Sequence, residues 1–274
     1  YANGRSISDR IQSIKSDFDI AAPWRSLTEL LKLNDELRAL PDSRFARRKQ
    51  AQLERIIASS MGLHLEARNE NAHVLAGSEM GISVEIVNRS PANARLAGLE
   101  ATYFDSSVWP DRRSLVSKDD LNISLTANQV ETVSLEASLA TNIPHTQPYW
   151  LEETPSIGIY KLRNRRLLEA ESLPDPISIV AKVEIEGHIV EFEAPLIKVT
   201  SDPVKGEVRE PVAIRPSLAL QAESAVTLFE DQEPKEVAVR IASNFGPISG
   251  VLEASFPNDW KVEVANPEFS LRGG

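Results

Sequence analysis

The segments Leu63-His-Leu-Glu-Ala67 and Ile82-Ser-Val-Glu-Ile86 decide the fold class of this 274-residue chain. In both, apolar and polar side chains alternate with a period of two, which predicts a strand that is buried on one face. We expect further strands over 95–104, 121–126, 130–136, 178–186 and 189–199, with Glu186-Gly-His188 as the hairpin turn between the last two. Short alternating strands separated by polar turns are typical of a β-sandwich.

The chain before Gly62 follows a helical pattern instead. Apolar residues recur on one face over 7–18, 30–40 and 45–61, which predicts three helices. Ser26-Leu-Thr-Glu29 has the form of a capping box at the start of the second helix, and Pro41-Asp-Ser43 ends that helix and caps the third. Each apolar face has to be buried, either against the other helices or against a neighbouring domain.

A second β module is expected after a linker. Ser201-Asp-Pro203 to Glu210-Pro211 is rich in proline and charge, as linkers are. The strands that follow are expected over 218–221, 225–229, 235–242, 249–255, 260–264 and 268–271. A sandwich needs about seven strands, so we expect the second module to be truncated.

The predicted fold is mainly β with an α-helical N-terminal segment and two tandem immunoglobulin- or fibronectin-like β-sandwiches. The expected domains are a helical segment over 1–61, a β-sandwich over 62–200 that contains a long Pro-rich loop over 138–175, a linker over 201–211, and the second sandwich over 212–274.

Composition excludes several classes of function. The net charge is −10, and residues 62–274 hold 19 Lys and Arg against 32 Asp and Glu. An acidic body lacks the concentrated basic face that nucleic acids require, so no nucleic-acid partner is expected. The chain has no cysteine, which removes disulfides and thiolate sites. No apolar run approaches the ~20 residues of a membrane helix, so we expect no membrane span.

The chain offers no recognisable catalytic motif. Its histidines, His64, His73, His145 and His188, have no metal-ligand spacing. Neither a nucleophile elbow nor a phosphate-binding loop is present. We expect no catalytic and no metal-binding residue in this chain. A self-contained enzyme with a site that the sequence does not reveal stays as an alternative.

The Pro-rich loop holds the candidate contact residues. Tyr149 and Trp150 form the densest aromatic patch in a chain that is 6% aromatic, and His145 and Gln147 precede them. One interpretation is a structural plug, in which Trp150 is buried and Tyr149 finds a polar partner. The other is a ligand or domain contact made by His145, Gln147, Tyr149 and Trp150, because loops carry function more often than cores do.

Four segments together resemble a known family. They are Gly62-Leu-His-Leu-Glu-Ala67, Val87-Asn-Arg-Ser90, Gln147-Pro-Tyr-Trp-Leu151 and Thr200-Ser-Asp-Pro-Val-Lys-Gly-Glu207. In this order they resemble the C-terminal region of large PIG-L (LmbE-like) deacetylases, especially those of Bacteroidetes, from about residue 5 to the end of the chain. Phe256-Pro-Asn-Asp-Trp260 looks like part of the sandwich domain often appended to glycan-active enzymes.

The resemblance implies a non-catalytic accessory region. Members of the family are typically secreted zinc-dependent hydrolases that remove the N-acetyl group of amino sugars, with a metal site around an Ala-His-Pro-Asp-Asp motif. This motif is absent from the chain, so the zinc and the catalytic domain are expected upstream of Tyr1. The implied partners are that upstream domain and a glycan, and the implied location is secreted, periplasmic or on a bacterial cell surface. The alternative is a stand-alone carbohydrate-binding or adhesin-like β-sandwich protein.

Overall fold

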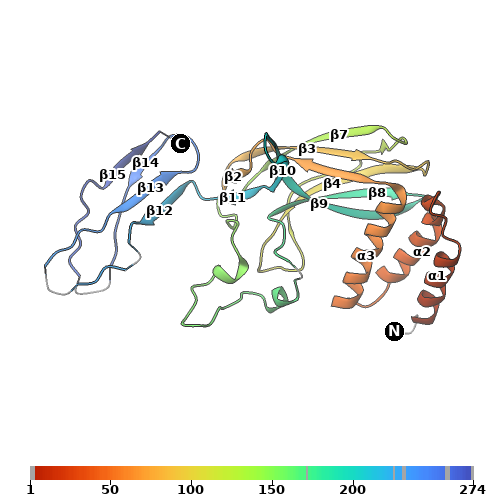
Figure 1. The fold of residues 1–274 in the computed structure, drawn as a ribbon, viewed down its shortest axis with the longest axis horizontal. Helices are drawn as coiled ribbons and strands as arrows, with labels where there is room; N and C mark the ends of the chain where they lie inside the picture. Colours follow the sequence, from red (N-terminus) through yellow and green to blue (C-terminus); the bar gives the residue numbers. More distant parts are fainter. Residues whose placement is uncertain (1–3, 171, 225, 230–232, 257–259, 273–274) are drawn as a thin grey trace. The chain divides into compact units, whose positions relative to one another are not determined.

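The computed structural model describes residues 4–170, 172–224, 226–229, 233–256 and 260–272 (Figure 1). The chain divides into two compact units, unit 1 over Tyr1–Ala213 and unit 2 over Ile214–Gly274. As predicted, the fold is mainly β with an N-terminal helical segment.

The helices of unit 1 match the three apolar patterns of the sequence. They are α1 (Gly4–Ser16), α2 (Leu27–Arg38) and α3 (Arg44–Met61), with a short 3-10 helix η1 (Pro23–Ser26) before α2. α2 packs against α3, and their apolar faces are buried through residues such as Leu31 and Ile57. α1 has no buried residue, so its apolar face stays largely open. In Figure 1 the three helices lie together below one end of the sheet.

The expected cap of α2 is wrong, whereas that of α3 is confirmed. Ser26 already has helical backbone angles because η1 begins at Pro23, and its side chain makes no capping hydrogen bond. Ser43 has an extended backbone, and its Oγ accepts a hydrogen bond from the amide of Ala46 at 3.1 Å. An extended N-cap residue aims its oxygen at the free amides of the first turn, and a residue already in a helical turn does not.

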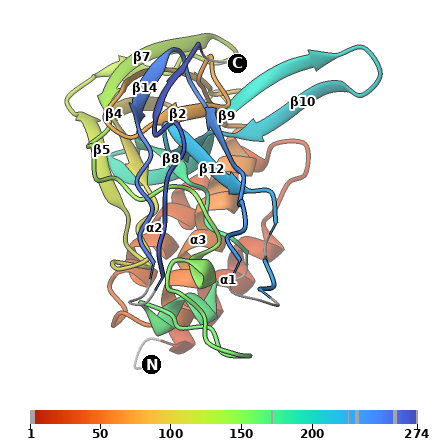
Figure 2. The ribbon, with the colours of Figure 1, turned by 90° about the vertical axis from the view of Figure 1, so that its left-hand side faces the viewer.

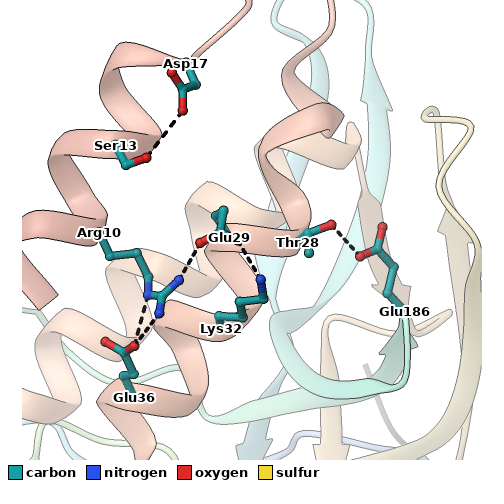
Figure 3. A network of polar contacts seen from close by, with 8 residues as sticks. All are labelled: Arg10, Ser13, Asp17, Thr28, Glu29, Lys32, Glu36 and Glu186. Carbon is teal, nitrogen blue, oxygen red and sulfur yellow. Dashed lines mark hydrogen bonds and ion pairs between the residues drawn. The ribbon is translucent and has the colours of Figure 1, made fainter. Parts of the chain in front are cut away.

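Glu29, which the capping box would place on Ser26, binds two cations instead (Figure 3). It pairs with Arg10 of α1 and with Lys32, whose Nζ lies 2.7 Å from a carboxylate oxygen of Glu29. Arg10 also donates to Glu36 at 2.8 Å. Ion pairs therefore connect α1 with α2, beside the half-buried side chains of Ile7 and Ile14. In a separate contact beside these ion pairs, the hydroxyl of Thr28 donates to Glu186 at 2.8 Å and so joins α2 to the turn between β8 and β9.

One nine-stranded sheet forms the body of unit 1. Its main path runs β5-β4-β8-β9-β1-β3-β7, with β6 beside β4 and β10 beside β9. Neighbours are antiparallel except β1 and β9, which are parallel. The ends of the path, β5 and β7, come into contact, so the sheet curls strongly. The strands are β1 (His64–Arg68), β3 (Glu79–Val87), β4 (Ala94–Tyr103), β5 (Arg113–Lys118), β6 (Ile123–Ser124), β7 (Val130–Ser138), β8 (Ile177–Ile185), β9 (His188–Asp202) and β10 (Gly206–Pro211), while β2 (His73–Leu75) lies outside this sheet.

The alternating residues supply the core, as the sequence predicts. Every second residue of β3, including Ile82, Val84 and Ile86, is buried. The turn between β8 and β9 is also where it is expected, with Glu186 and Gly187 both at positive φ. Two consecutive residues at positive φ fit the right-handed twist of a hairpin.

Residues 201–211 form a hairpin instead of the expected linker. β9 continues to Asp202, and β10 pairs with it from Gly206 to Pro211. Nearly all of β10 is exposed, and in Figure 2 this hairpin extends beyond the neighbouring strands. Charge and proline are typical of an edge strand that has no covered face, which explains why the segment resembles a linker in sequence.

Unit 2 consists of two β-hairpins. Its strands are β12 (Leu218–Ala222) paired with β13 (Val239–Ser243), and β14 (Ile248–Val251) paired with β15 (Glu268–Leu271), while β11 (Ala213–Arg215) lies at the division between the units. The described parts of the expected strands 225–229 and 260–264 are not strands. Within the described residues 215–272 no side chain is buried.

Candidate functional site

The candidate contact residues lie in the long connection between β7 and β8. As expected, residues 139–176 are mostly irregular, with two 3-10 helices, η2 (Tyr149–Leu151) and η3 (Arg165–Glu169). Figures 1 and 2 both show this green segment away from the sheet, on the side where the helices lie.

The structure brings two of the four candidate residues together. The rings of Tyr149 and Trp150 meet edge to face, with centroids 5.0 Å apart and planes at 85°. Both are half-buried, whereas His145 and Gln147 are exposed. The two rings pack on each other and both remain partly exposed, so both the structural plug and the ligand or domain contact stay predictions.

An acidic and basic cluster supports this aromatic pair. Glu152, directly after η2, accepts a hydrogen bond from the hydroxyl of the buried Ser106. Arg163 lies 2.8 Å from Glu153 and 3.8 Å from Glu152. Ser106 belongs to the connection between β4 and β5, so the cluster joins two loops that are far apart in the sequence. Arg163 offsets one of the two negative charges, and the hydrogen bond and ion pairs together hold the two loops to each other.

A second set of contacts fixes the part of the loop that leads to β8. The side-chain amide of Asn164 donates to the carbonyl oxygen of Trp109 at 2.8 Å, and the ring of Trp109 packs edge to face on Phe104 with centroids 5.8 Å apart. Leu167 in η3 is fully buried. Together with the Glu152 cluster, these contacts hold both arms of the loop on residues 104–109.

Arg112 is a buried cation that the sequence gives no reason to single out. Only 12% of its side chain is exposed. Its guanidinium donates to the hydroxyl of Thr102 at 2.9 Å and to the carbonyl oxygen of Asp175 at 2.8 Å. Burial lowers the pKa of Arg112, while the nearby carboxylates of Glu193 and Asp175 act in the opposite direction. Burial also raises the pKa of Asp175. Through these hydrogen bonds Arg112 connects β4 with the chain just before β8.

Glu66 of β1 is a buried carboxylate between two arginines. Arg68 of the same strand and Arg209 of β10 both donate to it, the latter at 2.6 Å. Burial raises the pKa of Glu66, but the hydrogen bonds and charges of the two arginines outweigh it, so the pKa lies below its ordinary value. His64 is 3.9 Å from the same carboxylate. The alternating pattern marks Glu66 as outward-facing, and it does not reveal that Arg209 of β10 reaches this carboxylate from a distant part of the chain.

Among the described residues no three His, Asp or Glu side chains gather closely enough to hold a metal ion. None of the helices in the described ranges has the length and the hydropathy that crossing a bilayer requires.

Comparison with known proteins gives no family. No family model matches the chain, and no curated protein matches it. Similar solved structures include the sporulation control protein Spo0M of Bacillus subtilis, with 10% identity and a TM-score of 0.28 over 56% of this chain and 49% of that one. Another is the Pseudomonas fluorescens alkylpurine DNA glycosylase AlkC bound to DNA containing an abasic site analog, with 12% identity and a TM-score of 0.25 over 66% and 49%. A CARDB domain from Pyrococcus furiosus has 8% identity and a TM-score of 0.26 over 56% and 89%. The chain spans about half the length of the first two.

Proposed function

We propose that this chain is the non-catalytic accessory region of a PIG-L-like, zinc-dependent deacetylase that acts on N-acetylated amino sugars. In this proposal its β units are immunoglobulin- or fibronectin-like sandwiches and the zinc belongs to a domain upstream. One observation carries the proposal. The residues on which the family resemblance rests shape turns and loops of the sheet, which is a structural role.

Asn88 is the first of these residues. It is completely buried, and its side-chain amide donates to the carbonyl oxygens of Ala92 at 2.9 Å and Leu125 at 3.2 Å. Its Oδ1 accepts from the amide of Ser90 at 3.0 Å and from the Ser90 hydroxyl at 2.8 Å. A side chain that satisfies this many buried groups shapes its loop and has no capacity left for a substrate.

Asp202 has the same kind of role in the segment Thr200–Glu207. Its Oδ1 accepts hydrogen bonds from the amides of Val204 and Lys205, both at 2.8 Å. Gly206 follows with a φ of +78°. An aspartate that holds the next amides and a glycine in the left-handed region specify a tight turn. A signature built from such residues is that of a structural module, which favours the accessory role over catalysis.

The helical segment offers a surface for the upstream domain. Ile11 on α1, Phe18 just after it, and Phe45 and Ile56 on α3 are exposed large apolar side chains. Residues eleven positions apart return to the same side of a helix, so Phe45 and Ile56 lie on one side of α3. Apolar residues grouped in this way favour a contact with another domain.

The intact protein tests the proposal. It should release acetate from N-acetylated amino sugars in the presence of zinc and lose this activity on chelation, whereas residues 1–274 alone should release none. Replacing Phe45 and Ile56 together by serine should weaken the contact between the helical segment and the catalytic domain. The melting temperature of the catalytic domain should then fall. Val204→Ser, at an exposed turn, is the matched control and should change nothing. An intact protein that hydrolyses no N-acetyl sugar, with or without zinc, would refute the enzymatic part.

Glycan binding is the second candidate, and exposed aromatic rings favour it. In unit 2 the rings of Phe229 and Trp260 have centroids 5.1 Å apart, and Phe256 lies 6.2 Å from Trp260. All three are exposed, and sugar rings stack on such surfaces. Retention on immobilised polysaccharides should fall after Trp260→Ala or after Tyr149→Ala with Trp150→Ala. Retention that neither change reduces would exclude these rings as the binding surface.

A further inference from the structure

One stretch of the loop between η2 and β8 has a charge opposite to that of the chain, while Glu152, Glu153, Glu169, Glu171 and Asp175 flank it. Residues 154–168 contain Lys161, Arg163, Arg165 and Arg166 and no acidic residue, although the net charge of the chain is −10. The side chains of Lys161, Arg165 and Arg166 are exposed. Arg163 is the member that pairs with Glu153. Three exposed cations therefore gather on one short stretch of an acidic protein.

The tip of this loop is apolar and ordered by its backbone. Ile157 is 102% exposed, Ile159 63% and Tyr160 58%. The backbones of Ser156 and Ile159 exchange two hydrogen bonds of 3.1 Å, and Gly158 has a φ of +74°. The turn thus presents two isoleucines and a tyrosine to solvent on a fixed backbone. Full exposure of isoleucine is unfavourable, so a turn built in this way points to a surface that covers it.

The base of the loop is fixed while the tip projects. Asn164 is bound to the carbonyl oxygen of Trp109 and Leu167 is fully buried, so the arms cannot fold back to cover the tip without losing these contacts. The apolar side chains stand at the end of this anchored loop, Lys161 follows them directly, and Arg165 and Arg166 lie next to the anchoring residues Asn164 and Leu167.

We propose that this tip loop, residues 156–166, docks on the surface of an anionic lipid bilayer. Ile157, Ile159 and Tyr160 enter the boundary between headgroups and acyl chains, where apolar side chains gain by burial and tyrosine is favoured. Lys161, Arg165 and Arg166 stay at the level of the lipid phosphates, which attract juxtamembrane cations.

A bilayer fits this tip better than a protein partner does. A stable protein interface buries about 1,200–2,000 Å² in total, and one turn with three apolar side chains offers only a small part of that area. A bilayer accepts a narrow apolar tip and provides negative charge around it. The inference goes beyond the deacetylase proposal and does not depend on it.

Flotation of the 274-residue chain with lipid vesicles tests the inference. The chain should float with vesicles of phosphatidylcholine and phosphatidylserine, remain unbound with phosphatidylcholine alone, and bind less as salt is added. Ile157→Ser with Ile159→Ser should lower the partition coefficient about tenfold or more, because each buried methylene contributes to insertion. Lys161→Gln with Arg165→Gln should lower it about tenfold and reduce its dependence on salt.

Ile20→Ser is the matched control, because Ile20 is 87% exposed but lies in the helical segment. Its binding should equal that of the unchanged chain, and circular dichroism should be the same for all variants. The inference is wrong if the chain does not bind anionic vesicles. It is also wrong if the tip variant, Ile157→Ser with Ile159→Ser, binds them as strongly as the Ile20→Ser control does. Binding to heparin that is equally strong in the tip variant would instead assign the cations to a soluble polyanion and overturn the lipid proposal.

Discussion

β3 and β13 have the same alternating pattern of apolar and polar residues, but their apolar side chains differ in burial. In β3 the apolar positions Ile82, Val84 and Ile86 are buried. In β13 Val239 is exposed and Ile241 is half-buried. The difference teaches that alternation predicts a strand and names its apolar face, while a core also needs a second layer to cover that face. Unit 1 supplies this layer by curling its sheet. In unit 2 the described residues between 215 and 272 form two hairpins without a buried side chain.

Amide hydrogen exchange should show the largest contrast between the units. Amides of β8, which has five fully buried apolar side chains (Ile177, Ile179, Ala181, Val183 and Ile185), should open only with global unfolding. Those of β13 should exchange on the order of a thousandfold faster, because little buried surface opposes local opening. Mass spectrometry of exchanged peptides measures both. Equal protection in β8 and β13 would mean that unit 2 has a core of its own in solution.

Core truncation should affect the two units differently. Ile86→Ala should lower the free energy of unfolding of unit 1 by about 2–4 kcal/mol, because it leaves a cavity in a packed core. Leu220→Ala in β12 should cost only about 0.5 kcal/mol, since Leu220 is 61% exposed. Urea unfolding followed by tryptophan fluorescence measures the change. A cost for Leu220→Ala as large as that of Ile86→Ala would contradict the comparison.

Two asparagines give a matched test of loop shaping. Asn88→Ala removes the side-chain donor to the buried carbonyl group of Leu125 and to the partly buried one of Ala92, and should cost about 2 kcal/mol. Asn244 of unit 2 also donates to a backbone carbonyl, that of Pro216 at 2.9 Å, but it is exposed. Water can replace that bond, so Asn244→Ala should cost less than about 0.5 kcal/mol. Thermal unfolding of the two variants, compared with the unchanged chain, ranks them directly.

The pH dependence of stability should sharpen the contrast further. The pKa of Glu66 is lower in the folded state than its ordinary value of 4.5, so its ion pairs stabilise the fold above that value, and this contribution is lost as the pH falls through the folded pKa. Glu66→Gln should cost about 1 kcal/mol at neutral pH, since both arginines are partly solvated, and less as the pH is lowered. Glu268→Gln in unit 2 is the control. A cost of Glu66→Gln that stays constant between neutral and acid pH would refute this role.

The sequence predicts the fold well where local pattern and burial agree. The helices, the main strands of unit 1 and the positive-φ turn at Glu186-Gly187 follow from periodicity and turn chemistry. β10 escapes prediction because an edge strand has no covered face to leave a pattern. Arg112 escapes it because its partners come from β4, β9 and the connection before β8, three parts of the chain that only the tertiary structure brings together. Of the candidate contact residues, the pairing of Tyr149 with Trp150 is visible as two adjacent rings, whereas the ion pairs of Arg163 depend on tertiary structure.

The coding sequence immediately upstream of Tyr1 tests the central claim most directly. The account predicts a domain that contains an Ala-His-Pro-Asp-Asp motif, which would supply the zinc site that an accessory region serves. A signal peptide that ends directly before Tyr1 would contradict the enzymatic assignment, and glycan binding by the exposed aromatic residues would then become the leading function.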